Sequence, residues 1–175
     1  MKTFAILLFI LAIPISAYSS YDVTRCFPGD KKIYSPSGKH SISWEEPKNE
    51  DDTHHIFYEG DTKTELLAFY RSVCVHWSPT EKFFALTDYT GSNISEVLIF
   101  SSDSIKKPRK IVDYLPEVAK AKFSKSSHGY VEVTGWNDKC LSVRVWGNTL
   151  DTSEPFEFII SCDVDSKTIK CNTTK

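Results

Sequence analysis

The sequence lacks the short motifs that mark the common catalytic chemistries. It contains no Gly-x-Ser-x-Gly nucleophile elbow, no glycine-rich phosphate loop and no His-Glu-x-x-His zinc motif. Several aspartates fall near the ends of predicted strands, where acid–base carboxylates and turn-forming aspartates both occur, so no catalytic pair stands out. These aspartates are Asp88, Asp103, Asp113, Asp138 and Asp151. The absences favour a protein that is not an enzyme.

No apolar run is long enough to span a bilayer. The longest, Phe4–Ile13, is about half of the roughly 20 residues that a transmembrane helix needs. Lys2 precedes this run, and Pro14 and small residues follow it, which is typical of a cleavable secretory signal peptide. We therefore predict a signal peptide over residues 1–19, cleaved after Ala17 or Ser19. A single β-rich domain over residues 20–175 would then be exported to the periplasm or the extracellular space.

An excess of positive charge is also absent. The chain has 21 Lys and Arg against 23 Asp and Glu, for a net charge of −2. This balance is too acidic to follow a phosphate backbone, so nucleic acid is not an expected partner. The one basic cluster, residues 106–110, is short and is interpreted as a solvated loop. Once the signal peptide is removed, no stable membrane insertion is expected.

Helix-period runs are scarce, and the apolar pattern mostly alternates with period two. Such alternation predicts half-buried strands. It occurs at Ile42–Trp44, Val73–Trp77, Tyr130–Thr134, Leu141–Trp146 and Phe156–Ile160. Turn-forming residues separate the strands at 36–38, 90–93 and 147–148, and a helical turn is expected only at Leu115–Lys120. The sequence therefore predicts an all-β fold of antiparallel sheets.

An aromatic residue, a serine and a turn recur three times along the chain. Each triplet is expected to end one short strand and open another. The triplets are Tyr34-Ser35-Pro36, Trp77-Ser78-Pro79 and Phe123-Ser124-Lys125. In the first copy Pro36 presets φ in the turn and Gly38 suits the left-handed position that closes it. The second copy has Glu81 where the first has Gly38, which predicts a turn that differs in detail.

Further apolar stretches bring the count to four predicted strands for roughly every 40 to 45 residues, which is the length and strand number of a propeller blade. Ile56–Tyr58 and Leu66–Tyr70 complete the first copy, and Val97–Phe100 and Lys110–Tyr114 complete the second. Aromatic-Ser-Pro-x-Gly-Lys followed by an apolar strand resembles the repeat of β-propellers of the WD-repeat and Tol-system periplasmic type. The segment Trp77–Leu86 matches best, and the resemblance covers about residues 31 to 170. It implies a fold built from three blade-like repeats and implies no activity.

Three blades are fewer than the roughly 4 to 8 with which propellers typically close. The repeats could form an open stack of sheets, a sandwich or barrel-like single core, or part of a ring completed by oligomerisation. We favour the single core, a sandwich or partial propeller, because an open stack leaves exposed sheet edges that invite aggregation.

The five cysteines are compatible with an oxidising compartment, which permits disulfides. They are Cys26, Cys74, Cys140, Cys162 and Cys171, and the odd number leaves at least one thiol free or paired between chains. Cys162 and Cys171 bracket a predicted hairpin with its turn near Asp165–Lys167, so we predict a disulfide between them. Cys74 lies in an alternating run and is equally compatible with a small buried side chain.

Aromatic and polar residues gather late in the chain and suggest a recognition surface. Aromatic rings with neighbouring polar groups suit protein or sugar binding. The candidate binding residues are Trp136, Asn137, Asp138, Arg144 and Trp146. Trp146 alternates with Leu141, Val143 and Val145, so it is exposed unless a second layer covers its face.

Metal ligands are not predicted, although two patterns that contain histidine have suitable side chains. His54 and His55 are adjacent and, with His40, suggest an imidazole site, but neighbouring strand residues point to opposite faces. Cys74 and His76 share a face, but the second ligand pair of a zinc site is missing. We expect no metal and no other cofactor.

These observations favour an exported, non-enzymatic β-domain that binds a protein or a cell-envelope component. One alternative is a secreted hydrolase whose carboxylates converge only in the folded chain. Another is an exported inhibitor or immunity-type protein, although no inhibitory loop can be named.

Overall fold

The computed structural model describes residues 25–46, 53–165 and 167–174, so the predicted signal peptide over residues 1–19 lies outside the described residues. The strands within these ranges are β1 (Arg25–Phe27), β2 (Lys32–Tyr34), β3 (Ser41–Glu45), β4 (His54–Glu59), β5 (Lys63–Phe69), β6 (Ser72–Trp77), β7 (Phe83–Tyr89), β8 (Glu96–Ser101), β9 (Ser104–Lys110), β10 (Ser126–Asn137), β11 (Cys140–Thr149), β12 (Pro155–Val164) and β13 (Ile169–Thr173). A 3₁₀ helix, η1 (Ile111–Tyr114), and an α-helix, α1 (Glu117–Ser124), lie between β9 and β10.

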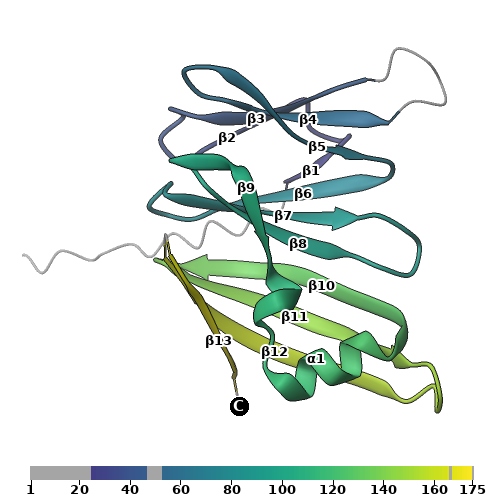
Figure 1. Cartoon of the computed structure of the whole chain (residues 1–175). Coiled ribbons are helices and arrows are strands. Elements are labelled where there is room, and N and C mark those ends of the chain that lie inside the picture. The colour runs from purple at the N-terminus through teal and green to yellow at the C-terminus, as the bar shows by residue number, and fades with distance from the viewer. Residues whose placement is uncertain (1–24, 47–52, 166, 175) are drawn as a thin grey trace, which may run out of the picture.

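The strands form three antiparallel sheets that follow one another along the chain and stack in space (Figure 1). The first sheet has the order β2-β3-β4-β5, the second β1-β6-β7-β8-β9, and the third β10-β11-β12-β13. Apart from β1, each sheet is a four-stranded meander of consecutive strands. The predicted all-β class and antiparallel sheets are confirmed.

The second sheet lies between the other two and is buried on both faces. Along β7, Phe84 and Leu86 pack towards the first sheet, whereas Phe83 and Ala85 pack towards the third. Both faces of the strand therefore exclude water, which explains why its apolar run is continuous instead of alternating. Each large apolar side chain buried in this way stabilises the fold by roughly 1.5–3 kcal/mol.

The buried residues form two clusters, one in each gap between successive sheets. The first lies between the first and second sheets and includes Ile42, Ile56 and Phe100. The other lies between the second and third sheets, includes Val143 and Ile160, and is extended by residues of η1 and α1. The prediction of a single core is therefore wrong. The second sheet separates two cores, because apolar side chains project from both of its faces.

Several local predictions need correction. The segment predicted as a strand at Lys110–Tyr114 ends β9 and then forms η1, and the predicted turn at Gly147 and Asn148 lies inside β11. The helical turn predicted at Leu115–Lys120 is confirmed in part: residues 117–120 open α1, which continues to Ser124, whereas Leu115 and Pro116 precede the helix. The basic cluster at residues 106–110 lies on the edge strand β9 and not in a loop. Its lysines and Pro108 are the residues that protect a sheet edge from further pairing.

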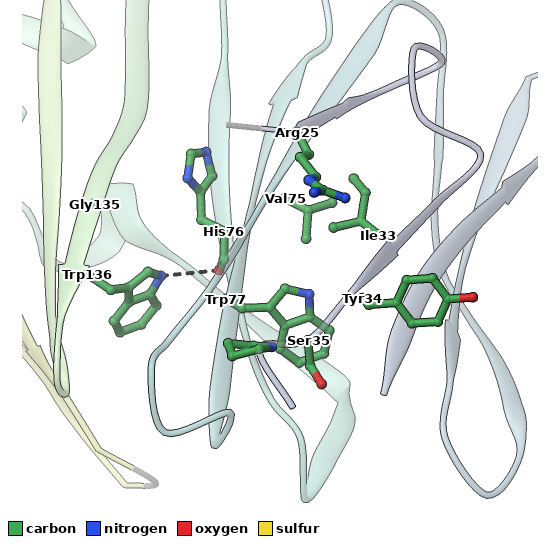
Figure 2. A pocket seen from close by; sticks show the side chains of 10 residues that line it. Arg25, Ile33, Tyr34, Ser35, Val75, His76, Trp77, Gly135 and Trp136 are labelled. Atoms are coloured by element: carbon green, nitrogen blue, oxygen red, sulfur yellow. Dashed lines mark hydrogen bonds between the residues drawn. The ribbon is translucent and has the colours of Figure 1, made fainter. Parts of the chain in front are cut away.

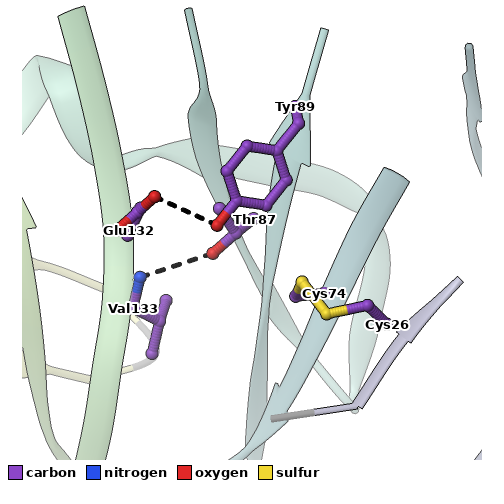
Figure 3. Close-up of a disulfide and its surroundings, with 6 residues drawn as sticks. All are labelled: Cys26, Cys74, Thr87, Tyr89, Glu132 and Val133. Carbon is purple, nitrogen blue, oxygen red and sulfur yellow. Dashed lines mark hydrogen bonds between the residues drawn. A yellow bond between two sulfur atoms is a disulfide. The ribbon is translucent and has the colours of Figure 1, made fainter. Parts of the chain in front are cut away.

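Two disulfides fix the strands in the described chain. The predicted Cys162–Cys171 disulfide is confirmed and links β12 to β13. A second disulfide, Cys26–Cys74, fastens the short strand β1 to β6 (Figure 3). Cys140 keeps a free thiol. This agrees with the prediction that an odd number of cysteines leaves at least one thiol free or paired between chains.

Polar contacts join the second sheet to the third. The hydroxyl of Thr87 accepts a hydrogen bond from the backbone N–H of Val133 at 3.3 Å, and the Tyr89 hydroxyl donates to Glu132 at 3.1 Å (Figure 3). Burial, followed by the charge of Glu132, raises the pKa of Tyr89 to about 12. These bonds fix the position of β10 beside the second sheet.

Within the described ranges, no helix combines the length and the apolar character that a membrane-crossing helix requires.

Candidate functional site

A groove of about 470 Å³ opens where the three sheets meet, at the end of β6 (Figure 2). Its walls come from β1, β2, β6 and β10 and from the turn that follows β2. The lining residues are Arg25, Ile33, Tyr34, Ser35, Pro36, Val75, His76, Trp77, Gly135 and Trp136. Its volume falls within the roughly 300–1,000 Å³ that is common for ligand pockets.

The groove lies beside three related turns, one at the end of the first hairpin of each sheet. The aromatic residue before each turn is Tyr34, Trp77 or Trp136, and each pairs across its hairpin with Ser41, Phe84 or Leu141. A residue with positive φ and then a lysine follow in every copy. The positive-φ residues are Gly38 (76°), Glu81 (59°) and Asp138 (54°).

The first two turns contain equivalent backbone hydrogen bonds. The N–H of Ser35 donates to the carbonyl of His40, and the N–H of Ser78 donates to the carbonyl of Phe83, each at 2.9 Å. Glu81 adopts the left-handed backbone that Gly38 adopts, so the prediction that the second turn differs in detail is wrong. The left-handed conformation costs a non-glycine residue roughly 1–2 kcal/mol, which other contacts of Glu81 must offset.

Those contacts join the two turns to each other. The Glu81 carboxylate accepts hydrogen bonds from the hydroxyls of Ser35 at 3.0 Å and Ser37 at 2.8 Å, and from the backbone N–H of Ser37. Burial raises the pKa of Glu81, but the hydrogen bonds from Ser37 and Ser35 outweigh it and leave the pKa below its usual value. The carboxylate thus ties the first sheet to the second at the rim of the groove.

The third copy of the repeat lies elsewhere than predicted. Phe123 and Ser124 end helix α1, so the triplet at Phe123–Lys125 is wrong as a strand-to-strand turn. The equivalent residues are Trp136, Asn137 and Asp138, at the turn between β10 and β11. The insertion of η1 and α1 lengthens the spacing, and the third turn is shorter, with Asn137 paired directly to Cys140. Both differences hide the repeat in the sequence.

Trp77 and Trp136 flank the end of β6 from opposite sides (Figure 2). Trp77 packs in the gap between the first and second sheets, with its ring centroid 4.9 Å from that of Phe84. Trp136 packs in the gap between the second and third sheets, and its indole N–H donates to the backbone carbonyl of His76 at 3.2 Å. The Tyr34 ring points away from the two indoles, and the residue is 57 % exposed.

The groove carries a single permanent charge on the residues that line it. Arg25 is exposed at the start of β1, and none of the lining residues is acidic. Arg25 is absent from all six ion pairs formed within the described part of the chain. The groove is therefore a mixed aromatic and polar surface with one cationic end.

The predicted binding residues are divided between two places. Trp136 lines the groove, and Asn137 and Asp138 form the exposed turn next to it. Arg144 and Trp146 lie on the opposite, uncovered face of the third sheet, where Arg144 stands 5.1 Å above the Trp146 ring and pairs with Glu157. There Trp146 stacks on Tyr130 with ring centroids 4.2 Å apart.

The predicted binding residues did not include Arg25, Trp77 or His76, although all three line the groove. For Trp77 the signal was present, because the aromatic-Ser-turn repeat marks the strand ends that meet at this site. Arg25 gave no comparable signal, since its position depends on the pairing of β1 with β6.

No group of three or more metal-ligating side chains lies together within residues 25–46, 53–165 and 167–174. His54 packs edge-on to Trp44 at 5.0 Å, whereas His55 on the other face pairs with Glu65. His40 interacts with the Tyr58 hydroxyl. Cys74 is in a disulfide, so it cannot form a thiolate–imidazole pair with His76. The expectation of no metal remains a prediction.

A second cavity of about 440 Å³ lies between α1 and the turn that joins β11 to β12. Asp151 and Glu154 line it together with Lys122 and Lys125, and all four side chains are exposed. Nothing in the described part of the chain indicates an enzyme activity.

Comparison of the chain with protein-family models, with curated proteins and with solved structures finds no significant match.

Proposed function

We propose that this chain is an exported β-domain that binds a protein or a cell-envelope component, without catalysing a reaction, through the groove at the end of β6. The observation that carries the proposal is the pair of indole rings, Trp77 and Trp136, that flank this groove beside the Arg25 cation, which has no ion-pair partner among the described residues. Tryptophan and arginine are enriched among the residues that contribute most to binding energy.

Two features support export. Residues 1–19 have the pattern of a signal peptide, and the Cys26–Cys74 and Cys162–Cys171 disulfides suit an oxidising compartment. Disulfides persist outside the cytoplasm, so the domain would act in the periplasm or outside the cell.

We also infer that the three sheets are related to propeller-type blades. The support is the succession of four-stranded antiparallel meanders, in each of which an aromatic residue near the end of the first strand is followed by a turn with a positive-φ residue and a lysine. In this arrangement the groove lies at the first strands of the three meanders, β2, β6 and β10. Repeated units commonly place their binding residues at equivalent positions.

The test is affinity retention with two tryptophan variants of the processed protein. Immobilised wild-type protein, Trp136→Ala and Trp146→Ala would each be incubated with an envelope or secreted fraction, and retained material would be identified by mass spectrometry. We expect the wild type and Trp146→Ala to retain the same component and Trp136→Ala to lose it. Circular dichroism and thermal unfolding would establish that both variants are folded.

Loss of retention in Trp146→Ala alone would move the binding site to the outer face of the third sheet. The absence of any specifically retained component, combined with turnover of a hydrolase substrate, would reject the proposal in favour of the secreted-hydrolase alternative.

A further inference from the structure

The two groove tryptophans differ in their hydrogen bonding. The indole N–H of Trp136 has the His76 carbonyl as its acceptor, whereas Trp77 Nε1 is shielded from solvent and has no acceptor within the described part of the chain. A shielded donor without an acceptor is unfavourable, so a ligand whose binding shifts the neighbouring side chains and brings an oxygen acceptor to this point would gain the missing bond. Carbonyl and carboxylate oxygens are such acceptors.

The charge of the groove further restricts the chemical class of ligand that it can bind. Arg25 offers a planar guanidinium with no ion-pair partner among the described residues, and none of the lining side chains bears a negative charge. A guanidinium at the edge of an aromatic groove without acidic lining residues favours a carboxylate, which it can bind through two parallel hydrogen bonds. A basic ligand would meet like charge and no compensating carboxylate.

The shape of the groove favours an extended chain over a compact group. Trp136 lies on one side of the end of β6, and Trp77 and Ser35 lie on the other (Figure 2). At Gly135 a Cβ atom would meet nothing within 4 Å, so this wall leaves open space. An extended segment crossing the end of β6 would meet Arg25, Trp77 and Trp136 together.

We propose that the groove binds an acidic, extended peptide segment of a partner protein. One carboxylate of the segment pairs with Arg25, a backbone or side-chain oxygen accepts from Trp77 Nε1, and an apolar side chain packs on Trp136. The inference rests on the proposed function and specifies the chemistry of its partner. A glycan would satisfy the aromatic surface and the indole donor but, when neutral, would leave Arg25 unpaired.

Selection from a displayed library of random 12-residue peptides tests this assignment even though the natural partner is unidentified. The processed wild-type protein and its Arg25→Gln variant would be used as baits. Arg71→Gln is the matched control, because Arg71 is also exposed but lies at the opposite end of β6 from Trp77. Peptides enriched on the wild type are expected to carry Asp or Glu next to an apolar residue.

Synthetic copies of the enriched peptides would then be titrated by tryptophan fluorescence. We expect Arg25→Gln to weaken binding by about tenfold or more and Arg71→Gln to leave it unchanged, as loss of a charge-assisted pair implies. Arg25→Glu should prefer peptides in which Lys replaces the acidic residue.

Enrichment of basic or uncharged peptides, or binding that is unaffected in Arg25→Gln, would overturn the inference. So would retention of a neutral oligosaccharide by the wild type and Arg25→Gln alike. An envelope partner that is lost in Trp136→Ala but retained in Arg25→Gln would preserve the proposed function and reject the acidic segment. If neither experiment yields a ligand, both proposals fail.

Discussion

The carboxylate of Glu81 accepts a hydrogen bond from the hydroxyl of Ser35 at 3.0 Å, which joins equivalent turns of two successive sheets. The two residues are 46 positions apart in the chain, yet both belong to the same repeated turn. Because the bond lies at the rim of the groove, it also fixes Ser35 and Pro36, which line one wall.

Replacing Glu81 by Gln should destabilise the fold by about 1–2 kcal/mol near neutral pH, since a charged acceptor of several hydrogen bonds becomes neutral. The pKa of Glu81 is lowered in the folded state, so its contribution is present above the usual carboxyl pKa and is lost as the pH falls through the folded-state value. Urea unfolding at neutral and acidic pH would measure both effects. An equal difference between the variant and the wild type at both pH values would contradict this role.

Asp88 should have the opposite pH dependence. The residue is 8 % exposed, and burial, followed by the charge of Glu96, raises the pKa of its carboxyl to about 6 from 3.8. The folded state therefore holds the proton more tightly than the unfolded state, and stability falls as the pH rises from about 4 to about 6. Asp88→Asn should be more stable than the wild type at pH 7, by roughly 1–3 kcal/mol, and similar to it near pH 4.

Unfolding curves across this pH range would test the Asp88 prediction, with Asp103→Asn as an exposed control that should change little. A stability difference for Asp88→Asn that does not vary with pH would rule out the titration of Asp88 as its cause.

Thr87→Val should weaken the attachment of the third sheet to the second. The substitution keeps the branched shape but removes the hydroxyl that accepts the buried N–H of Val133. An N–H left without an acceptor in the interior costs about 1–3 kcal/mol. Thr134→Val, at an exposed position on the same strand as Val133, is the matched control. Amide exchange at Val133 should accelerate in Thr87→Val and stay unchanged in Thr134→Val.

The two disulfides should differ in their contribution to stability. Cys26 and Cys74 are separated by 48 positions and Cys162 and Cys171 by 9. Chain-entropy arguments give about 4 kcal/mol for the longer loop and about 3 kcal/mol for the shorter. Guanidinium unfolding of the Cys26→Ser/Cys74→Ser and Cys162→Ser/Cys171→Ser variants would compare them. A larger loss on removing Cys162–Cys171 would show that native-state contacts outweigh loop length.

Local features of the sequence predicted much of the fold. Alternation at Leu141–Trp146 and Phe156–Ile160 identified half-buried strands, and two cysteines bracketing a hairpin identified the Cys162–Cys171 disulfide. These predictions succeeded because a strand's alternation and a hairpin's closure depend on residues near one another in the chain.

The candidate site was predicted only in part. Trp136 was identified, but Trp146 was grouped with it, although the two rings lie on opposite faces of the third sheet. Which face of that sheet is covered depends on the second sheet, whose strands lie far away in the sequence. Another long-range contact, the pairing of β1 with β6, brings Arg25 and Cys26 beside Val75 and Cys74.

By itself, the sequence determined an all-β chain with repeated turns, because side-chain alternation and turn chemistry act over a few residues. Tertiary structure decided that the second sheet has two buried faces, that Glu81 bridges two turns and that Trp77, Trp136 and Arg25 share one groove. The physical reason is that these relationships arise from packing between sheets, and the free energy of that packing depends on surfaces that the local pattern of any one strand does not specify.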